Sequence, residues 1–160
     1  MLSSGIVVGR GSLKPRLRHL YCMAVQIPLQ GPSDMFKNPN LYVISGGPGS
    51  GKTTVLQELA KIGFPHAPEV ARQIIQEQTM GGGTALPWLD RESYMQLMLE
   101  RSIESYLEHF PSLQSTFSDR GIPDTLCYAR LIGLLDIGLI ESACREYRYA
   151  PGVFLVWCPG

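Results

Sequence analysis

Eight consecutive residues combine glycines with a lysine and a threonine at a spacing that suits phosphate binding. They fit the pattern G-x-x-x-x-G-K-[ST] and are Gly46, Gly47, Pro48, Gly49, Ser50, Gly51, Lys52 and Thr53. Glycines let backbone N–H groups converge on phosphate oxygens at close range. A lysine here reaches the β- and γ-phosphates, and the threonine hydroxyl ligates Mg²⁺. The segment predicts a site for ATP, or alternatively GTP, with Mg²⁺, and Thr54 is expected only to support it.

A second acidic position lies downstream, at Asp119. It follows the short run 115–118, which reads as a strand. The carboxyl end of a parallel strand lies beside the phosphate site in folds of this kind, so we expect Asp119 and Thr53 to hold the metal. Arg120 comes next, and it suits a second anionic group or the charge on a transferred phosphoryl group. The alternative is a surface ion pair or turn.

Hydrophobic periodicity predicts strands that alternate with helices. The expected strands are 41–45, 66–67, 115–118 and 152–158, and the expected helices are 51–62, 69–79, 91–110, 123–134 and 138–147, the third capped by Asp90. Such alternation predicts an α/β fold of three layers, with a parallel sheet covered by helices on both faces. Trp157, in the last strand, is expected to be buried.

Composition limits the classes of partner. The chain has 160 residues, of which 44% are hydrophobic, and its 14 basic and 14 acidic residues cancel. It therefore lacks the net positive field that draws proteins to nucleic acid. No apolar run reaches the ~20 residues that span a bilayer. The four scattered cysteines indicate reduced thiols and a cytoplasmic location.

The N-terminal segment differs from the remainder. Residues 1–33 contain four basic residues and no acidic one. They are consistent with a mitochondrial presequence, and equally with a disordered arm or a misassigned translation start before Met23 or Met35. We therefore divide the chain into a basic tail, 1–37, and a nucleotide-binding domain, 38–160.

Three segments together resemble a known family. They are the loop 46–53, the segment 68–72 (PEVAR) and the segment 118–124 (SDRGIPD). In this order they resemble the AAA-type P-loop domain of NadR-type ribosylnicotinamide kinases, which are related to thymidylate and deoxynucleoside kinases. The resemblance extends from about Leu41 to the end of the chain.

The resemblance implies a role for Glu69. In such kinases a carboxylate at this position orients the acceptor hydroxyl or takes its proton. Arg72, one helical turn later, would share that face and bind an anion; alternatively the two residues form a surface ion pair. Family members also carry an arginine-bearing lid beyond the strand 152–158, so we expect the domain to be truncated at its C-terminus.

These observations predict Mg²⁺-dependent phosphoryl transfer from ATP to a small hydroxyl-bearing metabolite such as a nucleoside or riboside. Lys52, Glu69, Asp119 and Arg120 are the expected catalytic residues. The alternative is a switch or regulatory NTPase whose nucleotide state is sensed by a protein or lipid partner. A binding module without turnover is a third interpretation.

Overall fold

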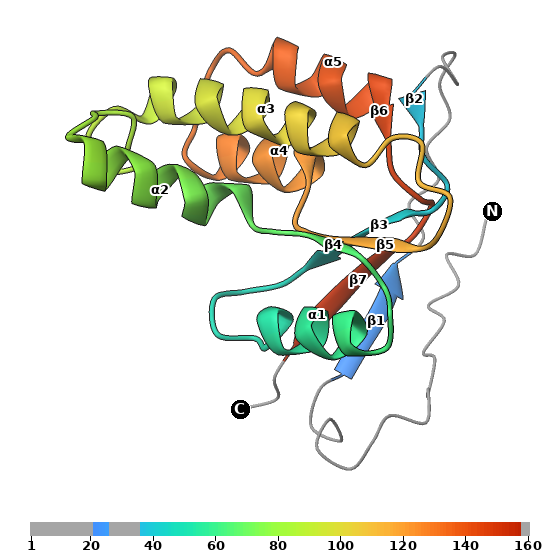
Figure 1. The fold of residues 1–160 in the computed structure, drawn as a ribbon. Helices are drawn as coiled ribbons and strands as arrows, with labels where there is room; N and C mark the ends of the chain where they lie inside the picture. Colours follow the sequence, from blue (N-terminus) through green and yellow to red (C-terminus); the bar gives the residue numbers. More distant parts are fainter. Residues whose placement is uncertain (1–20, 26–35, 158–160) are drawn as a thin grey trace.

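The core of the protein is a five-stranded sheet with the strand order β1-β7-β3-β5-β4 (Figure 1). The structure is a computed structural model that describes residues 36–157 in full and the backbone of residues 21–25. The strands are β1 (Tyr21–Val25), β7 (Val153–Trp157), β3 (Leu41–Ser45), β5 (Thr116–Asp119) and β4 (His66–Ala67). The last four are parallel to one another, and β1 is antiparallel to β7. A second, parallel pair joins β2 (Phe36–Lys37) to β6 (Tyr147–Arg148).

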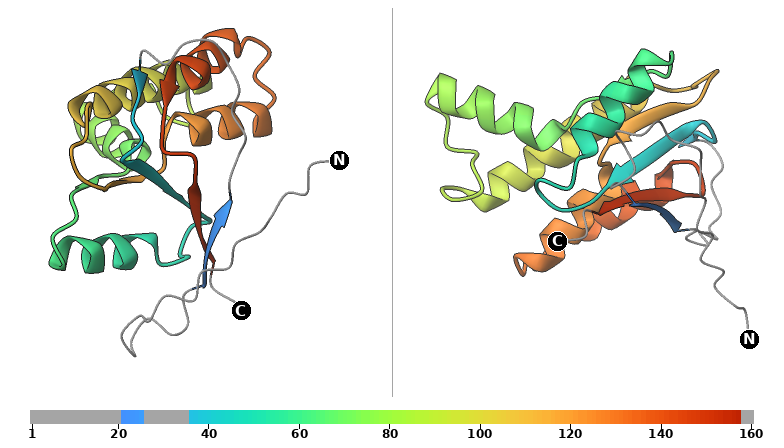
Figure 2. Two further views of the ribbon diagram at one scale, coloured as in Figure 1. Left: turned by 90° about the vertical axis from the view of Figure 1, so that its right-hand side faces the viewer. Right: turned by 90° about the horizontal axis from the view of Figure 1, so that it is seen from below.

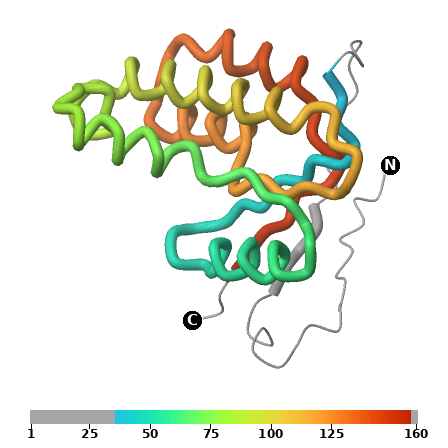
Figure 3. The backbone as a smooth tube through the Cα atoms, viewed as in Figure 1, coloured from blue at the N-terminus to red at the C-terminus, as the bar shows by residue number. Residues whose placement is uncertain are grey.

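Helices cover both faces of the sheet. They are α1 (Lys52–Lys61), α2 (Val70–Gly81), α3 (Arg91–Glu108), α4 (Ile122–Leu131) and α5 (Gly138–Glu146). Figure 1 shows α1 on one side of the sheet and the other four on the opposite side, and the views in Figure 2 agree. The predicted three-layer α/β architecture is therefore confirmed. In the backbone trace of Figure 3, the coils of the helices and the extended segments between them can be followed along the chain from β3 to β7.

Each helical layer has its own apolar core. On the α1 side, Leu56 packs against Ile44 of β3 and Val156 of β7. On the other side, a cluster joins the four helices through Ile74, Tyr94, Met95, Met98, Ala129 and Ile140. The chain thus buries enough apolar surface on both faces to hold the strand ends in fixed positions.

The start of α3 confirms the predicted cap at Asp90. Its Oδ1 accepts a hydrogen bond of 3.0 Å from the backbone N–H of Ser93, which satisfies one of the free donors of the first turn. This hydrogen bond also lowers the pKa of Asp90. Upstream, α2 extends two residues beyond its predicted end at Thr79. It ends where Gly82 adopts the left-handed conformation, with a φ of 67°.

Strand β1 was not expected from the sequence. Its residues fall within the segment 1–37, which was assigned to a basic tail, yet Tyr21 aligns with Trp157 and Val25 with Val153. An open strand edge offers unpaired N–H and C=O groups, and the apolar, β-prone run 21–25 supplies a matching ladder. One edge of the last strand, β7, is therefore paired with β1. Residues 1–20 and 26–35, which bear most of the presequence interpretation, lie outside the described residues.

Trp157 also departs from expectation. Its side chain is 56% exposed rather than buried. Side chains alternate along a strand between the two faces, and the preceding Val156 occupies the buried position against α1.

The small sheet depends on a buried tyrosine, which yields a first prediction. Tyr106 Oη lies 2.7 Å from the carbonyl oxygen of Phe36 in β2 and 2.8 Å from that of Arg148 in β6. We expect Tyr106→Phe to lower the free energy of unfolding by about 1–2 kcal/mol, since the carbonyl oxygen that accepts the hydroxyl proton loses its donor. Urea denaturation measures this. The control is Tyr42→Phe, whose hydroxyl makes no hydrogen bond within the described residues. Equal effects of the two substitutions would contradict the prediction.

Candidate functional site

The candidate site lies where three parallel strands end. Ile44 near the end of β3 aligns with Asp119 at the end of β5, and Ala67 of β4 aligns with Ser118. The loop from Gly46, the residue Glu69 and the segment after Asp119 therefore leave the sheet at the same edge. This is the edge at which parallel α/β sheets bind ligands.

The glycines of the loop adopt backbone conformations that other residues avoid. Gly46 has a φ of 143°, Gly49 of 73° and Gly51 of 93°. Gly51 is also the residue that precedes the first turn of α1. The loop therefore wraps directly onto the positive end of a helix, which is the arrangement that favours bound phosphate.

Gly46 is further constrained by the strand beside it, which gives a second prediction. A Cβ added there would lie 2.3 Å from the carbonyl oxygen of Val156, whereas one added at Gly47 would meet nothing within 4 Å. We expect Gly46→Ala to lower the free energy of unfolding by about 2–4 kcal/mol, because backbone must move and a positive φ is retained. Gly47→Ala, measured without nucleotide, should change it by less than about 1 kcal/mol. Thermal unfolding of both variants checks the ranking, and the reverse order would refute this account of the loop.

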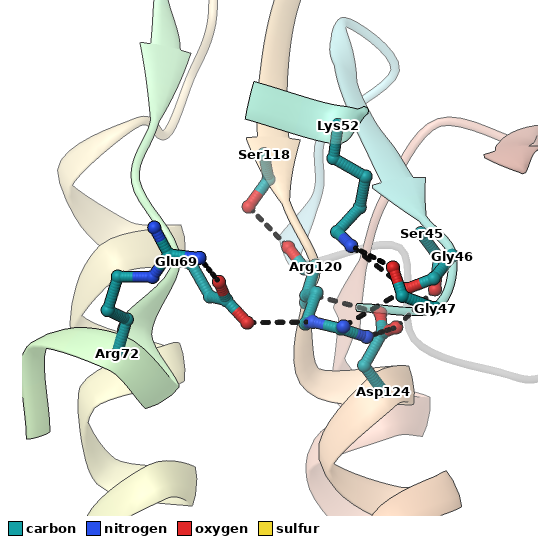
Figure 4. Close-up of polar contacts among 10 residues, drawn as sticks. Ser45, Gly46, Gly47, Lys52, Glu69, Arg72, Ser118, Arg120 and Asp124 are labelled. Carbon is teal, nitrogen blue, oxygen red and sulfur yellow. Dashed lines mark hydrogen bonds and ion pairs between the residues drawn. The ribbon is translucent and has the colours of Figure 1, made fainter. Parts of the chain in front are cut away.

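Lys52 is the first residue of α1, and its side chain folds back over the loop. Its Nζ donates hydrogen bonds of 2.9 Å to the carbonyl oxygens of Gly46 and Gly47 (Figure 4). The residue is only 7% exposed. Burial lowers the pKa of Lys52, and the nearby guanidinium of Arg120 adds to the effect. A cation is thus held under the loop in a setting where a phosphate would offset the cost of its burial.

Arg120 lies at the centre of the site and joins its parts. Its Nε donates to Glu69 Oε1 at 3.0 Å and its Nη2 to the carbonyl oxygen of Gly46 at 3.0 Å, while Nη1 lies 3.5 Å from Asp124 Oδ1 (Figure 4). The backbone of Arg120 has a φ of 69°, the only positive value among the described residues other than glycine. Such strain persists where surrounding contacts impose it, and here Ile44 accepts from the Arg120 N–H at 2.9 Å.

Glu69 precedes α2, and its carboxylate makes no capping hydrogen bond to that helix. It turns instead toward Arg120, and its second oxygen lies 3.5 Å from the guanidinium of Arg72. Glu69 is mostly buried, whereas Arg72 is largely exposed. The surface pair expected as the alternative is therefore present, but the stronger partner of Glu69 is Arg120, inside the site.

Asp119 is buried, with 7% exposure, and its Oδ1 has no hydrogen-bond partner among the described residues. Burial raises the pKa of Asp119, and the Glu69 carboxylate adds to the effect. The hydroxyl of the loop residue Ser50 is likewise buried and has no hydrogen-bond partner among the described residues. Carboxylate and hydroxyl oxygens suit Mg²⁺, so Asp119 and Thr53 fit the predicted metal site.

Within residues 36–157, no group of three or more His, Cys, Asp or Glu side chains could enclose a metal ion. A magnesium ion that is shared with nucleotide phosphates needs only one or two protein ligands. The residues present therefore match a metal that binds together with nucleotide.

Two cavities open at the site. The first, which we call the loop cavity, has a volume of about 320 Å³ and is lined by residues 48–53 with Glu69, Arg72 and Arg120. The second, the side cavity, has a volume of about 760 Å³ and lies between the start of the loop and helices α2, α3 and α4. Glu69 and Arg120 line both. Of the predicted residues, Lys52, Glu69 and Arg120 are thus brought together where the two cavities meet, whereas Thr54 lines neither cavity. Asp119 lines only a smaller cavity, which it shares with Glu69 and Arg120.

Sequence reasoning missed part of this arrangement. Asp124 Oδ1 accepts from Ser45 Oγ at 2.5 Å and its Oδ2 from the Gly121 N–H at 3.0 Å, so it links α4 to the strand that leads into the loop. An acidic residue three positions after the residue that begins a helix is typical of a cap, but this pattern does not predict the contact with Ser45. Tyr94 and Tyr128, whose rings meet edge to face at 6.2 Å, line the side cavity rather than serving only the core.

Comparison with known sequences supports the geometry. A family model described as an AAA domain matches residues 41–158, which is most of the chain. No curated protein matches the chain significantly. No helix in the described part of the chain has the length and apolar character to cross a lipid bilayer. With its phosphate-binding loop between β3 and α1, the chain belongs to this AAA-domain family of nucleotide-binding P-loop proteins.

Proposed function

We propose that the protein transfers the terminal phosphoryl group of ATP, in a Mg²⁺-dependent reaction, to a hydroxyl group of a small metabolite. The observation that carries the proposal is that Glu69 and Arg120 line both cavities. A hydrolase needs one cavity for nucleotide and a path for water. A phosphotransferase needs a second cavity whose polar groups meet the phosphoryl group.

Each residue has a defined task in this reaction. Lys52 and the loop N–H groups bind the phosphates. Glu69 accepts the proton of the acceptor hydroxyl while the oxygen of that hydroxyl forms a bond to the γ-phosphorus. The bond between that phosphorus and the oxygen that bridges to the β-phosphate breaks, and ADP leaves. Arg120 balances the charge that accumulates on the transferred group. Thr53 and Asp119 would hold Mg²⁺, which neutralises phosphate charge when bound.

The test is a transfer assay with the full chain. The protein is incubated with Mg²⁺, γ-labelled ATP and a pool of nucleosides and ribosides, and the labelled products are separated. Label on an organic acceptor, absent in the Lys52→Ala variant, is the expected result. Label found only in inorganic phosphate, at a rate that the pool does not change, would rule the proposal out.

The second candidate is a switch or regulatory NTPase. The specific observation in its favour is that Arg120 contacts both Glu69 and the loop carbonyl of Gly46, so that loop and helix α2 share one side chain. A change of nucleotide state could then shift α2. Release of inorganic phosphate alone, in the same assay, is the result this candidate predicts.

A further inference from the structure

The side cavity has two chemically distinct ends. Three charged side chains gather at the end beside the loop, from Glu69, Arg120 and Asp124. Away from them the wall is made largely of apolar and aromatic side chains, among them Ala71, Tyr94, Met98, Tyr128, Leu131 and Leu155. Its volume of about 760 Å³ lies within the range of sites for small organic ligands. A ligand that fills this space therefore places one polar group near the loop and its body against apolar walls.

The charges at the polar end disfavour an anion. Two carboxylates, from Glu69 and Asp124, face one guanidinium, so the formal charge of the cavity lining is minus one. Each of the three nitrogens of that guanidinium has one contact, with Glu69, Asp124 or the carbonyl oxygen of Gly46, so the cation is already paired with both carboxylates. The cations Lys52 and Arg72 line the loop cavity and not the side cavity. An anionic acceptor would enter a lining whose one cation, Arg120, is already paired with two carboxylates, and it would lie beside the excess negative charge.

We infer that the acceptor is a neutral alcohol with an apolar or flat unsaturated body, and not a phosphorylated compound such as a nucleotide or sugar phosphate. This inference rests on the proposed function and narrows its acceptor class. The hydroxyl group lies at the end lined by Glu69, and the body lies along α4 against Tyr128 and Leu131. The products are a nucleoside diphosphate and a phosphate monoester of the alcohol.

Matched pairs of acceptors test the charge preference. The probes are uridine and uridine monophosphate, monooctanoylglycerol and its phosphate, and ribose as a neutral acceptor without an apolar body. The expected result is a kcat/KM at least about tenfold higher for the neutral member of a pair, which corresponds to about 1.4 kcal/mol. The kcat/KM for ribose is expected to be lower than that for the preferred neutral acceptor. Better use of uridine than of monooctanoylglycerol would assign a flat ring as the body, and the reverse an aliphatic chain.

Failure of the inference and failure of the proposed function give different results. Equal or better transfer to the phosphorylated members would overturn the inference and leave the kinase function standing. Transfer to ribose as efficient as to the preferred neutral acceptor would also overturn it. Phosphate release without any organic product would remove the proposed function itself, and the inference with it.

A substitution pair tests the position of the body. Leu131 lines the side cavity and is 82% exposed, whereas Leu135, four residues further along the chain and beyond the end of α4, is 99% exposed and does not line it. We expect Leu131→Arg to raise the KM of the preferred neutral acceptor about tenfold, and to raise the kcat/KM of its phosphorylated counterpart, because the arginine supplies the missing cation. The KM of ATP should not change, and Leu135→Arg should change neither. The same acceptor KM in both variants would contradict the placement of the body along α4.

Discussion

Replacement of Lys52 by alanine is expected to slow phosphoryl transfer by about 10³-fold or more, through kcat rather than through the KM of the acceptor. The ammonium group is held beneath the loop by two carbonyl oxygens, at 2.9 Å each. A charge aimed at oxygens that become more negative in the transition state stabilises that state more than the ground state. Rates measured with γ-labelled ATP at saturating acceptor give the comparison.

The control for this substitution lies on the same helix. Lys61 is the last residue of α1, is largely exposed and pairs with Glu58 at 2.6 Å. Lys61→Ala removes a cation of the same kind and is expected to leave transfer within about twofold, since exposed ion pairs contribute little. Circular dichroism and urea unfolding of the Lys52→Ala variant show whether its fold is retained. A folded variant with a rate within tenfold of the original would contradict the role given to Lys52.

The elements that position the site were predictable because they depend on local pattern. The glycine-lysine loop, the strand before it and the helix after it fall where the sequence placed them, from Leu41 to Lys61. Glycines at positive φ and a cap at Asp90 are features of single residues and their near neighbours. The placement of Asp119 at the carboxyl edge followed from the rules of parallel sheets and needed no contact information.

The contacts between segments could not be predicted in the same way. The site joins Ser45 to Asp124, which are 79 residues apart, and Glu69 to Arg120, which are 51 apart. Which carboxylate an arginine selects depends on packing of whole helices, and periodicity within one helix does not contain that information. Strand β1 was missed for the same reason, because its pairing depends on the distant edge of β7.

The side cavity is lined in part by residues whose spacing is typical of a buried core. Tyr94 and Met98 recur at helical spacing in α3, a pattern that predicts core residues, and both are buried. They also line the side cavity, which lies between α2, α3 and α4 beside the loop. An apolar stripe predicts burial, but it does not distinguish a wall packed by protein from one that a ligand contacts.

Substitution of Asp119 by asparagine is expected to have opposite effects on stability and on activity. The carboxylate is buried, its Oδ1 lacks a partner in the described residues, and burial raises its pKa. Without Mg²⁺ or nucleotide, its ionised form therefore destabilises the fold. Asp119→Asn should raise the free energy of unfolding by about 1 kcal/mol, measured by urea denaturation near neutral pH with a chelator present. The same variant should lose about 10²- to 10³-fold in Mg²⁺-dependent transfer.

The pH dependence of the free energy of unfolding tests independently whether the Asp119 carboxylate destabilises the fold. A carboxyl group whose pKa is higher in the folded state than in the unfolded state destabilises the fold fully above the folded pKa, and this effect disappears as pH falls toward the unfolded value. The stability difference between Asp119→Asn and the original protein should therefore be largest near neutral pH and should become smaller as pH is lowered. Asp136→Asn, at an exposed position, serves as the control and should show little difference at any pH. A variant of Asp119 that is less stable than the original at neutral pH would mean that the carboxylate supports the fold, and the assignment of this residue to the metal would lose its structural basis.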